Sequence, residues 1–152
     1  MHIEKKLKNM AIELPLPPQP GGKYLPYQRT RHLVYISGQI CKLDGEIRYQ
    51  GKVGKDLTEQ QGKLAARIAC LNALSVLKMA IGDLDKVVKI VNVHGYVNSA
   101  EGFTSQPNVI NGASELLIDI FGERGRHSRC ALAVNELPAN STVELEMIVE
   151  VD

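Results

Sequence analysis

Residues 142–151 read T-V-E-L-E-M-I-V-E-V and contain the most regular pattern in the chain. Every second residue is apolar (Val143, Leu145, Met147, Val149 and Val151), and the residues between them include Glu144, Glu146 and Glu150. Successive side chains of a β-strand point to opposite faces of a sheet, so this alternation predicts a strand with one apolar face. The stretch therefore favours a sheet that is covered by other elements on one side.

The preceding stretch, about residues 127–135, sorts in the same way. Cys130, Leu132 and Val134 share one parity, and Arg129, Ala131 and Ala133 share the other. If the apolar sets of both strands face the helices, Arg129 and Glu144 lie together on the opposite face. The two alanines would leave room for a ligand beside the arginine.

Helical spacing marks two longer segments. Thr58 and Gln61 resemble a capping box that opens a helix ending at Gly82, and a second helix is expected from Ser105 to Gly122. Residues 1–13 are compatible with a short amphipathic helix, and the proline- and glycine-rich run 15–22 is expected to be an extended arm on the surface. The chain thus divides into an N-terminal arm, 1–22, and one domain, 23–152.

Further strands are expected at 24–30, at 33–40, through Ile47 after the Asp44-Gly45 turn, and at 87–97. The order β-β-β-α-β-α-β-β predicts a single α+β domain with a mixed sheet and two helices packed on one face. Strands 33–40 and 87–97 are apolar on both faces, and two helices cover only one. We therefore expect self-association through the second face, the alternative being that the N-terminal arm covers it.

Composition narrows the classes of function. The 152 residues carry a net charge of +1 and only 5% aromatic residues, which disfavours nucleic-acid binding. Three cysteines without a CxxC and histidines without HxH or HExxH spacing predict neither a disulfide frame nor a metal site. With no signal-peptide core and no long uninterrupted apolar run, we expect a cytoplasmic protein that does not enter a membrane.

Arg129 is the strongest candidate for binding chemistry. A guanidinium is always charged and binds a carboxylate through two parallel hydrogen bonds. The alternative role is an ion pair between subunits, with Glu144 or Glu146 as its partner. Gly112 lies inside the second expected helix, where it indicates either close helix packing or the edge of a site. His127 shares the parity of Arg129, and both are candidates to line one cleft.

Several motifs together resemble the RidA/YjgF family of reactive-imine deaminases, also described as the endoribonuclease L-PSP family. They are Ser37-Gly38-Gln39-Ile40, Asn111-Gly112-Ala113-Ser114-Glu115-Leu116-Leu117, Arg129-Cys130-Ala131, and Leu137-Pro138 followed by Val143-Glu144-Leu145-Glu146. Gly125-Arg126-His127 before the arginine is similar to a long-form branch. The resemblance implies a chorismate-mutase-like fold, a homotrimer with clefts between subunits, and hydrolysis of enamines or imines such as 2-aminoacrylate to 2-keto acids and ammonia without a cofactor.

The resemblance also implies residue roles. Arg129 would grip the substrate carboxylate, and Glu144 would position or activate water. Asn111, Ser37, the backbone around Ala131, and Tyr24 (or Tyr27 in its place) would bind substrate. Cys130 and Ala131 depart from the Ser or Thr and the Cys that many members have there, so cysteine-dependent regulation does not transfer. Two alternatives remain: a non-catalytic protein that binds a 2-keto acid, and an endoribonuclease.

Overall fold

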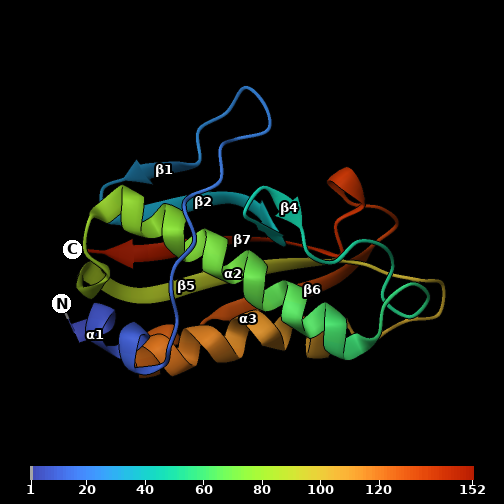
Figure 1. Ribbon diagram of the computed structural model, residues 1–152. Coiled ribbons are helices and arrows are strands. Elements are labelled where there is room, and N and C mark those ends of the chain that lie inside the picture. Colours follow the sequence, from blue (N-terminus) through green and yellow to red (C-terminus); the bar gives the residue numbers. More distant parts are fainter. Residues whose placement is uncertain (1) are drawn as a thin grey trace.

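The computed structural model describes residues 2–152 and has a five-stranded mixed sheet at its centre (Figure 1). The strands are β1 (Tyr27–Thr30), β2 (Leu33–Ile40), β5 (Val87–Asn98), β6 (Ser128–Val134) and β7 (Val143–Val151), in the spatial order β1-β2-β7-β5-β6. Within this five-stranded sheet, only the β5–β6 pair is parallel. The predicted single-domain α+β class with a mixed sheet is confirmed.

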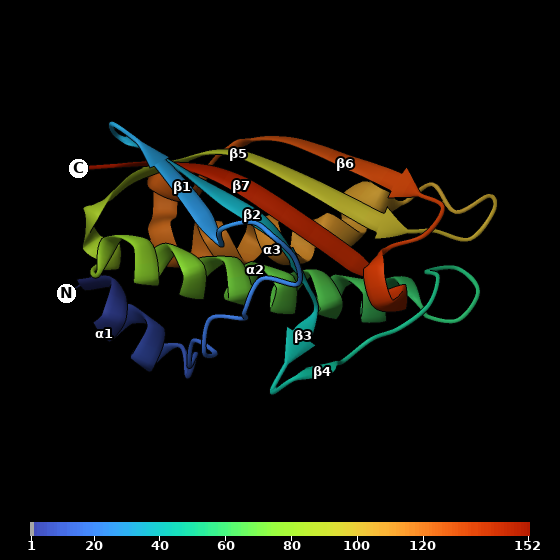
Figure 2. The ribbon, with the colours of Figure 1, turned by 90° about the horizontal axis from the view of Figure 1, so that it is seen from above.

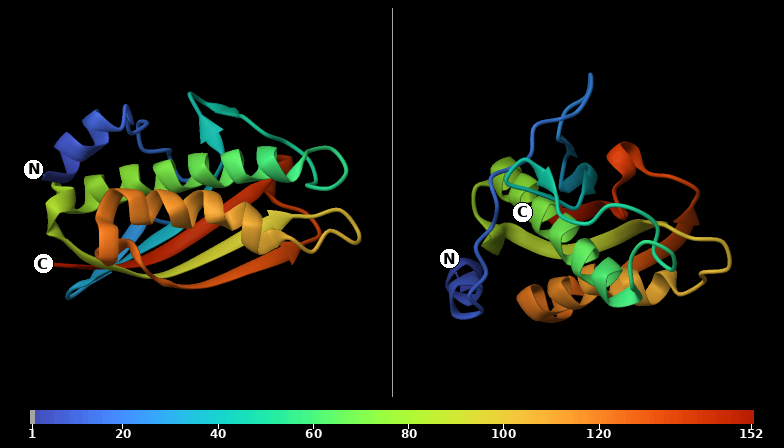
Figure 3. Two further views of the ribbon diagram at one scale, coloured as in Figure 1. Left: turned by 90° about the horizontal axis from the view of Figure 1, so that it is seen from below. Right: turned by 45° about the vertical axis from the view of Figure 1, so that its right-hand side comes forward.

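Two long helices, α2 (Glu59–Ile81) and α3 (Gln106–Phe121), lie side by side across one face of this sheet (Figures 2 and 3). The capping box of α2 is present: the Gln61 amide donates to Thr58 Oγ1 at 3.1 Å and the Thr58 amide donates to Gln61 Oε1 at 2.9 Å. Gly82 caps its end with φ 78°, a conformation that favours glycine. Both predicted helices are confirmed.

The core lies between the helices and the sheet. All five apolar residues of β7 that alternate with the glutamates are buried, as their spacing predicts. By length and composition α2 could cross a membrane, yet 61% of its apolar window is buried within the domain. Its apolar character is accounted for by packing against α3, β2 and β7.

The N-terminal segment up to Pro15 packs on the helix layer and not on the second face of the sheet. Helix α1 (His2–Asn9) buries Ile3 and Leu7, and the Asp85 carboxylate accepts hydrogen bonds from the amides of His2 and Ile3 at 2.7 and 2.8 Å. Further along, Ser75 Oγ on α2 donates to the carbonyl of Pro15 at 2.7 Å. This part of the arm therefore does not cover the second face, and residues 18–21 reach only the cavity beside Glu144.

Two local details differ from the expected elements. The first strand begins at Tyr27, after the proline at position 26. The short strand after the Asp44-Gly45 turn belongs to a separate hairpin, β3 (Lys42–Leu43) and β4 (Glu46–Ile47), and not to the main sheet. Short 3₁₀ turns, Leu84–Lys86, Gly122–Gly125 and Pro138–Asn140, connect the remaining elements.

Gly112 brings α3 against the backbone of α2. A Cβ added there would stand 2.0 Å from the carbonyl oxygen of Lys63, too close for any side chain. We expect Gly112→Ala to lower the free energy of unfolding by about 3 kcal/mol or more, because the helices must separate. Gly21→Ala is the matched control, since nothing lies within 4 Å of that position. Equal urea midpoints for the two variants would contradict close helix packing.

Candidate functional site

Arg129 projects from β6 toward the helix layer. In the parallel β5–β6 pair it lies beside Val93, which is fully buried against the helices. Its Nη1 donates to Asn111 Oδ1 at 2.7 Å and to Ser114 Oγ at 3.1 Å, and its Nη2 donates to the Pro107 carbonyl at 3.4 Å. These three acceptors are uncharged, so they orient the guanidinium without neutralising its charge.

The prediction that Arg129 and Glu144 share one face is wrong within a single chain. Glu144 pairs with Tyr96, and Tyr96 pairs with Leu132, so these three residues form one row on the second face. Leu132 is 52% exposed and Cys130 is exposed, whereas Cys130 was expected to point to the core. Strand β6 is an edge strand, and its more apolar side points away from the helices. The assumption that the more apolar side faces the core therefore gave the wrong orientation for this strand.

The Glu144 carboxylate lies against the backbone of β2. A Cβ added at Gly38 would stand 3.1 Å from Glu144 Cδ, so glycine at position 38 leaves the room that the carboxylate occupies. The β2–β7 register shifts between Ile36 and Gln39, a bulge that re-aims this part of the strand. Burial raises the pKa of Glu144 above its ordinary value, and the negative charge of Glu146 adds to the effect.

A cavity of about 350 Å³ opens beside Glu144. Its walls come from the N-terminal arm, from β2 and from the turn before β7; they include Pro18, Pro20, Tyr24, Gly38, Pro138 and Glu144. The Tyr24 hydroxyl accepts a hydrogen bond from the Gly21 amide at 3.2 Å. Tyr27, the alternative to Tyr24, packs against the core. The structure thus brings Tyr24 and Glu144 together in one cavity.

Ser37 lines a neighbouring cavity of about 400 Å³, together with His94 and Glu146. Its hydroxyl donates to the Leu25 carbonyl at 2.7 Å and so anchors the segment that follows Tyr24. Within the same cavity, Glu146 Oε1 accepts a hydrogen bond from the Tyr96 hydroxyl at 3.0 Å and lies 3.0 Å from His94 Nδ1. Ser37 is therefore close to the Glu144 region without sharing its cavity.

The remaining predicted residues gather around Arg129. Asn111 contacts it directly, and Ala131 follows two positions along β6, beside Gly95. Ser114 was not singled out from the sequence; it lies one helical turn from Asn111 on α3 and accepts from Arg129. Its spacing of three from Asn111 was the signal available. His127 is joined to this group through Ser114, at 2.9 Å.

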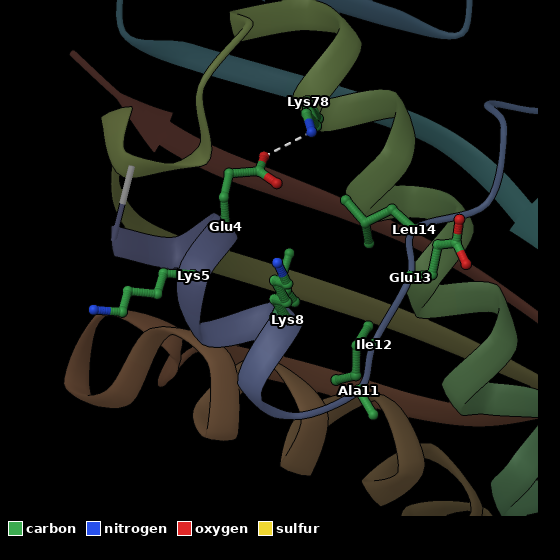
Figure 4. Close-up of a pocket in the computed structure, with 9 residues that line it drawn as sticks. Glu4, Lys5, Lys8, Ala11, Ile12, Glu13, Leu14 and Lys78 are labelled. Atoms are coloured by element: carbon green, nitrogen blue, oxygen red, sulfur yellow. Dashed lines mark ion pairs between the residues drawn. The ribbon is translucent and has the colours of Figure 1, made fainter.

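A larger cavity lies outside both groups, between α1, the segment that follows it and α2 (Figure 4). It measures about 760 Å³ and contains the ion pair of Lys78 with Glu4 at 2.7 Å. None of the predicted site residues lines it. Among residues 2–152, no group of three or more His, Cys, Asp or Glu side chains is arranged to hold a metal ion.

The pKa of Glu144 provides a test of this geometry. We expect a carboxyl-detected NMR titration to give Glu144 a pKa above the ordinary value of a glutamate, because burial disfavours its charged form. Glu146→Gln should lower that pKa by removing a like charge. Glu150→Gln is the control, since Glu150 is paired with Lys89 at the other end of β7. A Glu144 pKa that is unchanged in Glu146→Gln would show that the two carboxylates do not interact.

Known proteins resemble nearly the whole of this chain. The model of the family described as "YjgF/chorismate_mutase-like, putative endoribonuclease" matches residues 4–151. Protein TCP17 of Trypanosoma cruzi is 38% identical over 151 residues, covering 99% of this chain and 94% of TCP17.

Two solved structures superpose closely. The protein Atu1372 of Agrobacterium tumefaciens, of unknown function, has a TM-score of 0.92 at 38% identity, covering 99% of this chain and 92% of that one. A protein of Shewanella oneidensis called a "putative endoribonuclease" has a TM-score of 0.95 at 36% identity, covering 98% and 99%.

Proposed function

The chain belongs to the YjgF/chorismate-mutase-like family, and on that premise we propose that it hydrolyses reactive enamines and imines of the 2-aminoacrylate type to 2-keto acids and ammonia. The observation that carries the proposal is the Arg129 guanidinium, held by neutral acceptors with its charge left for a ligand carboxylate. A second group, Glu144 with Tyr24, supplies a carboxyl beside a cavity.

The two groups cannot meet within one chain, because Arg129 faces the helix layer and Glu144 lies on the second face of the sheet. We therefore propose that the working cleft forms between subunits, with Arg129, Asn111 and Ala131 from one copy and Tyr24 and Glu144 from its neighbour. Support for assembly comes from the second face, where Tyr35 and Leu132 are 44% and 52% exposed. A homotrimer, as the family resemblance implies, would repeat this cleft at each interface.

Once the substrate is bound, hydrolysis of the imine requires only a water molecule and a group that transfers protons. An enamine first takes a proton at carbon to become the imine, whose carbon is already electrophilic. Water adds to that carbon while the Glu144 carboxylate accepts a proton from the water. The same carboxyl returns that proton to nitrogen, which gives the carbinolamine. The remaining hydroxyl proton then passes to nitrogen through the same carboxylate as the C–N bond breaks, so that ammonia leaves and the 2-keto acid remains. A carboxyl whose pKa is raised by burial is better matched to both transfers near neutral pH.

Arg129 contributes by orientation. A bidentate grip on the substrate carboxylate fixes the position of the imine carbon relative to Glu144. The translational and rotational entropy of the substrate is then lost on binding and no longer adds to the barrier of the chemical step. Asn111 helps to orient the guanidinium, because its Oδ1 accepts a hydrogen bond from Arg129 Nη1 at 2.7 Å. No residue needs to act as a nucleophile.

The test uses 2-iminopropionate generated in situ by an amino-acid oxidase, with its decay followed against buffer. We expect a saturable acceleration by the wild-type protein. If the imine decays at the buffer rate while calorimetry detects pyruvate or 2-ketobutyrate binding, the protein is a binding module. Salt-sensitive RNA cleavage in place of both would indicate the nuclease named in the family description; the net charge of +1 disfavours that outcome.

A further inference from the structure

Behind Arg129 lies a second layer of hydrogen bonds that the proposed reaction does not use. Ser114 Oγ is 3.1 Å from Arg129 Nη1 and 2.9 Å from His127 Nε2. The other ring nitrogen, His127 Nδ1, is 2.7 Å from the Gly125 carbonyl oxygen. The four groups form one chain from the backbone before β6 to the guanidinium.

The direction of each bond follows from the groups involved. A carbonyl only accepts, so His127 Nδ1 carries the proton and donates to Gly125. The Nε2 of the neutral ring is then an acceptor, and the Ser114 hydroxyl donates to it. That leaves the lone pairs of Ser114 Oγ for the Arg129 N–H. Every donor in the chain has one acceptor.

We propose that His127 and Ser114 are a positioning pair that fixes the orientation of the Arg129 guanidinium for a carboxylate ligand. The inference rests on the carboxylate-binding role proposed for Arg129. Asn111 also accepts from Nη1, and the Pro107 carbonyl accepts from Nη2, but at the longer distance of 3.4 Å. Ser114 gives Nη1 its second acceptor, and because His127 holds the Ser114 hydroxyl, the two short bonds to Nη1 define the plane of the guanidinium.

The surroundings make the pair rigid. Ser114 is 9% exposed and sits on α3. Gly125 packs so closely on the end of α3 that an added Cβ would stand 2.2 Å from the Leu117 carbonyl oxygen, so the carbonyl that anchors His127 has a fixed place. Burial lowers the pKa of His127, the bond to Gly125 opposes this, and the charge of Arg129 lowers it further. The net effect favours the neutral ring, which is the form in which Nε2 accepts.

A serine hydrogen-bonded to a histidine also suggests a nucleophile, but the geometry favours a holding role. A nucleophilic hydroxyl must face the reacting carbon. Ser114 Oγ is instead enclosed between the guanidinium and the imidazole, with its residue nearly fully buried. The Ser114 hydroxyl faces Arg129 Nη1, and a ligand would contact the side of the guanidinium that points away from Ser114.

The experiment measures the guanidinium directly, by NMR of arginine-labelled protein. The readout is the rate at which the two Nη groups of Arg129 exchange by rotation. We expect His127→Leu and Ser114→Ala to raise this rate roughly five- to tenfold through the loss of one hydrogen bond. His127→Gln should stay near wild type, because its amide oxygen lies at about the reach of Nε2 and accepts from Ser114. His32→Gln is the control: His32 bonds the Val151 carbonyl, far along the chain from Arg129.

Kinetics on the same proteins gives a second readout. His127→Leu should raise KM for the imine roughly tenfold with kcat nearly unchanged, and His127→Gln should restore it. Equal Nη exchange in wild type, His127→Leu and Ser114→Ala would overturn the positioning role. If the wild type hydrolyses no imine, the proposed function fails, but Nη exchange still decides whether the pair holds Arg129.

Discussion

Replacing Arg129 with alanine is expected to lower kcat/KM for imine hydrolysis by roughly 30- to several thousand-fold, the loss of about 2–5 kcal/mol that follows removal of one partner of a hydrogen-bonded charge pair. The guanidinium is oriented by Asn111 and Ser114, and its charge has no carboxylate among these acceptors. A substrate carboxylate would supply the missing anion. Steady-state kinetics with the in situ imine measures the effect.

Two further variants sharpen this test. Arg129→Lys keeps the charge but loses the planar fork, so it should recover only part of the lost activity. Arg126→Ala is the matched control, because Arg126 lies three residues away, is exposed and pairs with Glu123 at 3.0 Å. If Arg126→Ala and Arg129→Ala lose activity equally, the effect reflects general charge near β6 and not a specific grip.

Much of the fold was predictable because local signals and packing agree. The capping box at Thr58, the terminating Gly82 and the alternation in β7 each describe an element whose environment matches its sequence. Gly112 was open to two interpretations, and the 2.0 Å approach to Lys63 identifies close helix packing. Helix caps and strand alternation depend on residues that are close together in the sequence, so a single sequence is enough to predict them.

The arrangement of the site was less predictable. The alternation in β6 correctly separates Arg129 from Cys130, but it does not state which set faces the helices, and the apolar set turned out to be on the second face. Where a sheet has a second apolar face, hydrophobicity no longer identifies the core side. The same feature that predicts self-association therefore led to the wrong face for Arg129.

Which distant residues come together in the site depends on how the strands pair, and no local sequence pattern encodes that pairing. Arg129 reaches Ser114 because β6 runs parallel to β5 under α3. Tyr24 lines the same cavity as Glu144 because the segment before β1 lies beside the irregular part of β2. His127 and Ser114 meet only through this topology. The candidate site residues could therefore be predicted from the sequence, but the residues that they contact could not.

Mixing two inactive variants is expected to restore activity if the cleft is shared between subunits. Arg129→Ala damages one half of the cleft, and Glu144→Gln damages the other. In a mixed assembly, an interface that takes Arg129 from the Glu144→Gln chain and Glu144 from the Arg129→Ala chain is intact. The two variants should be denatured together, refolded as an equal mixture, and assayed against each variant refolded alone.

The size of the recovery follows from counting. In a trimer assembled at random, about three quarters of the molecules are mixed and each has one intact cleft of three, so the mixture should regain roughly a quarter of wild-type activity. Arg129→Ala mixed with Asn111→Ala is the control, because both lesions lie in the same half and no interface escapes damage. Activity that stays at the level of the separate variants in both mixtures would rule out a cleft built from Arg129 of one subunit and Glu144 of the next. Since the sheet itself separates these two side chains within each chain, that result would leave Arg129 without its proposed catalytic partner.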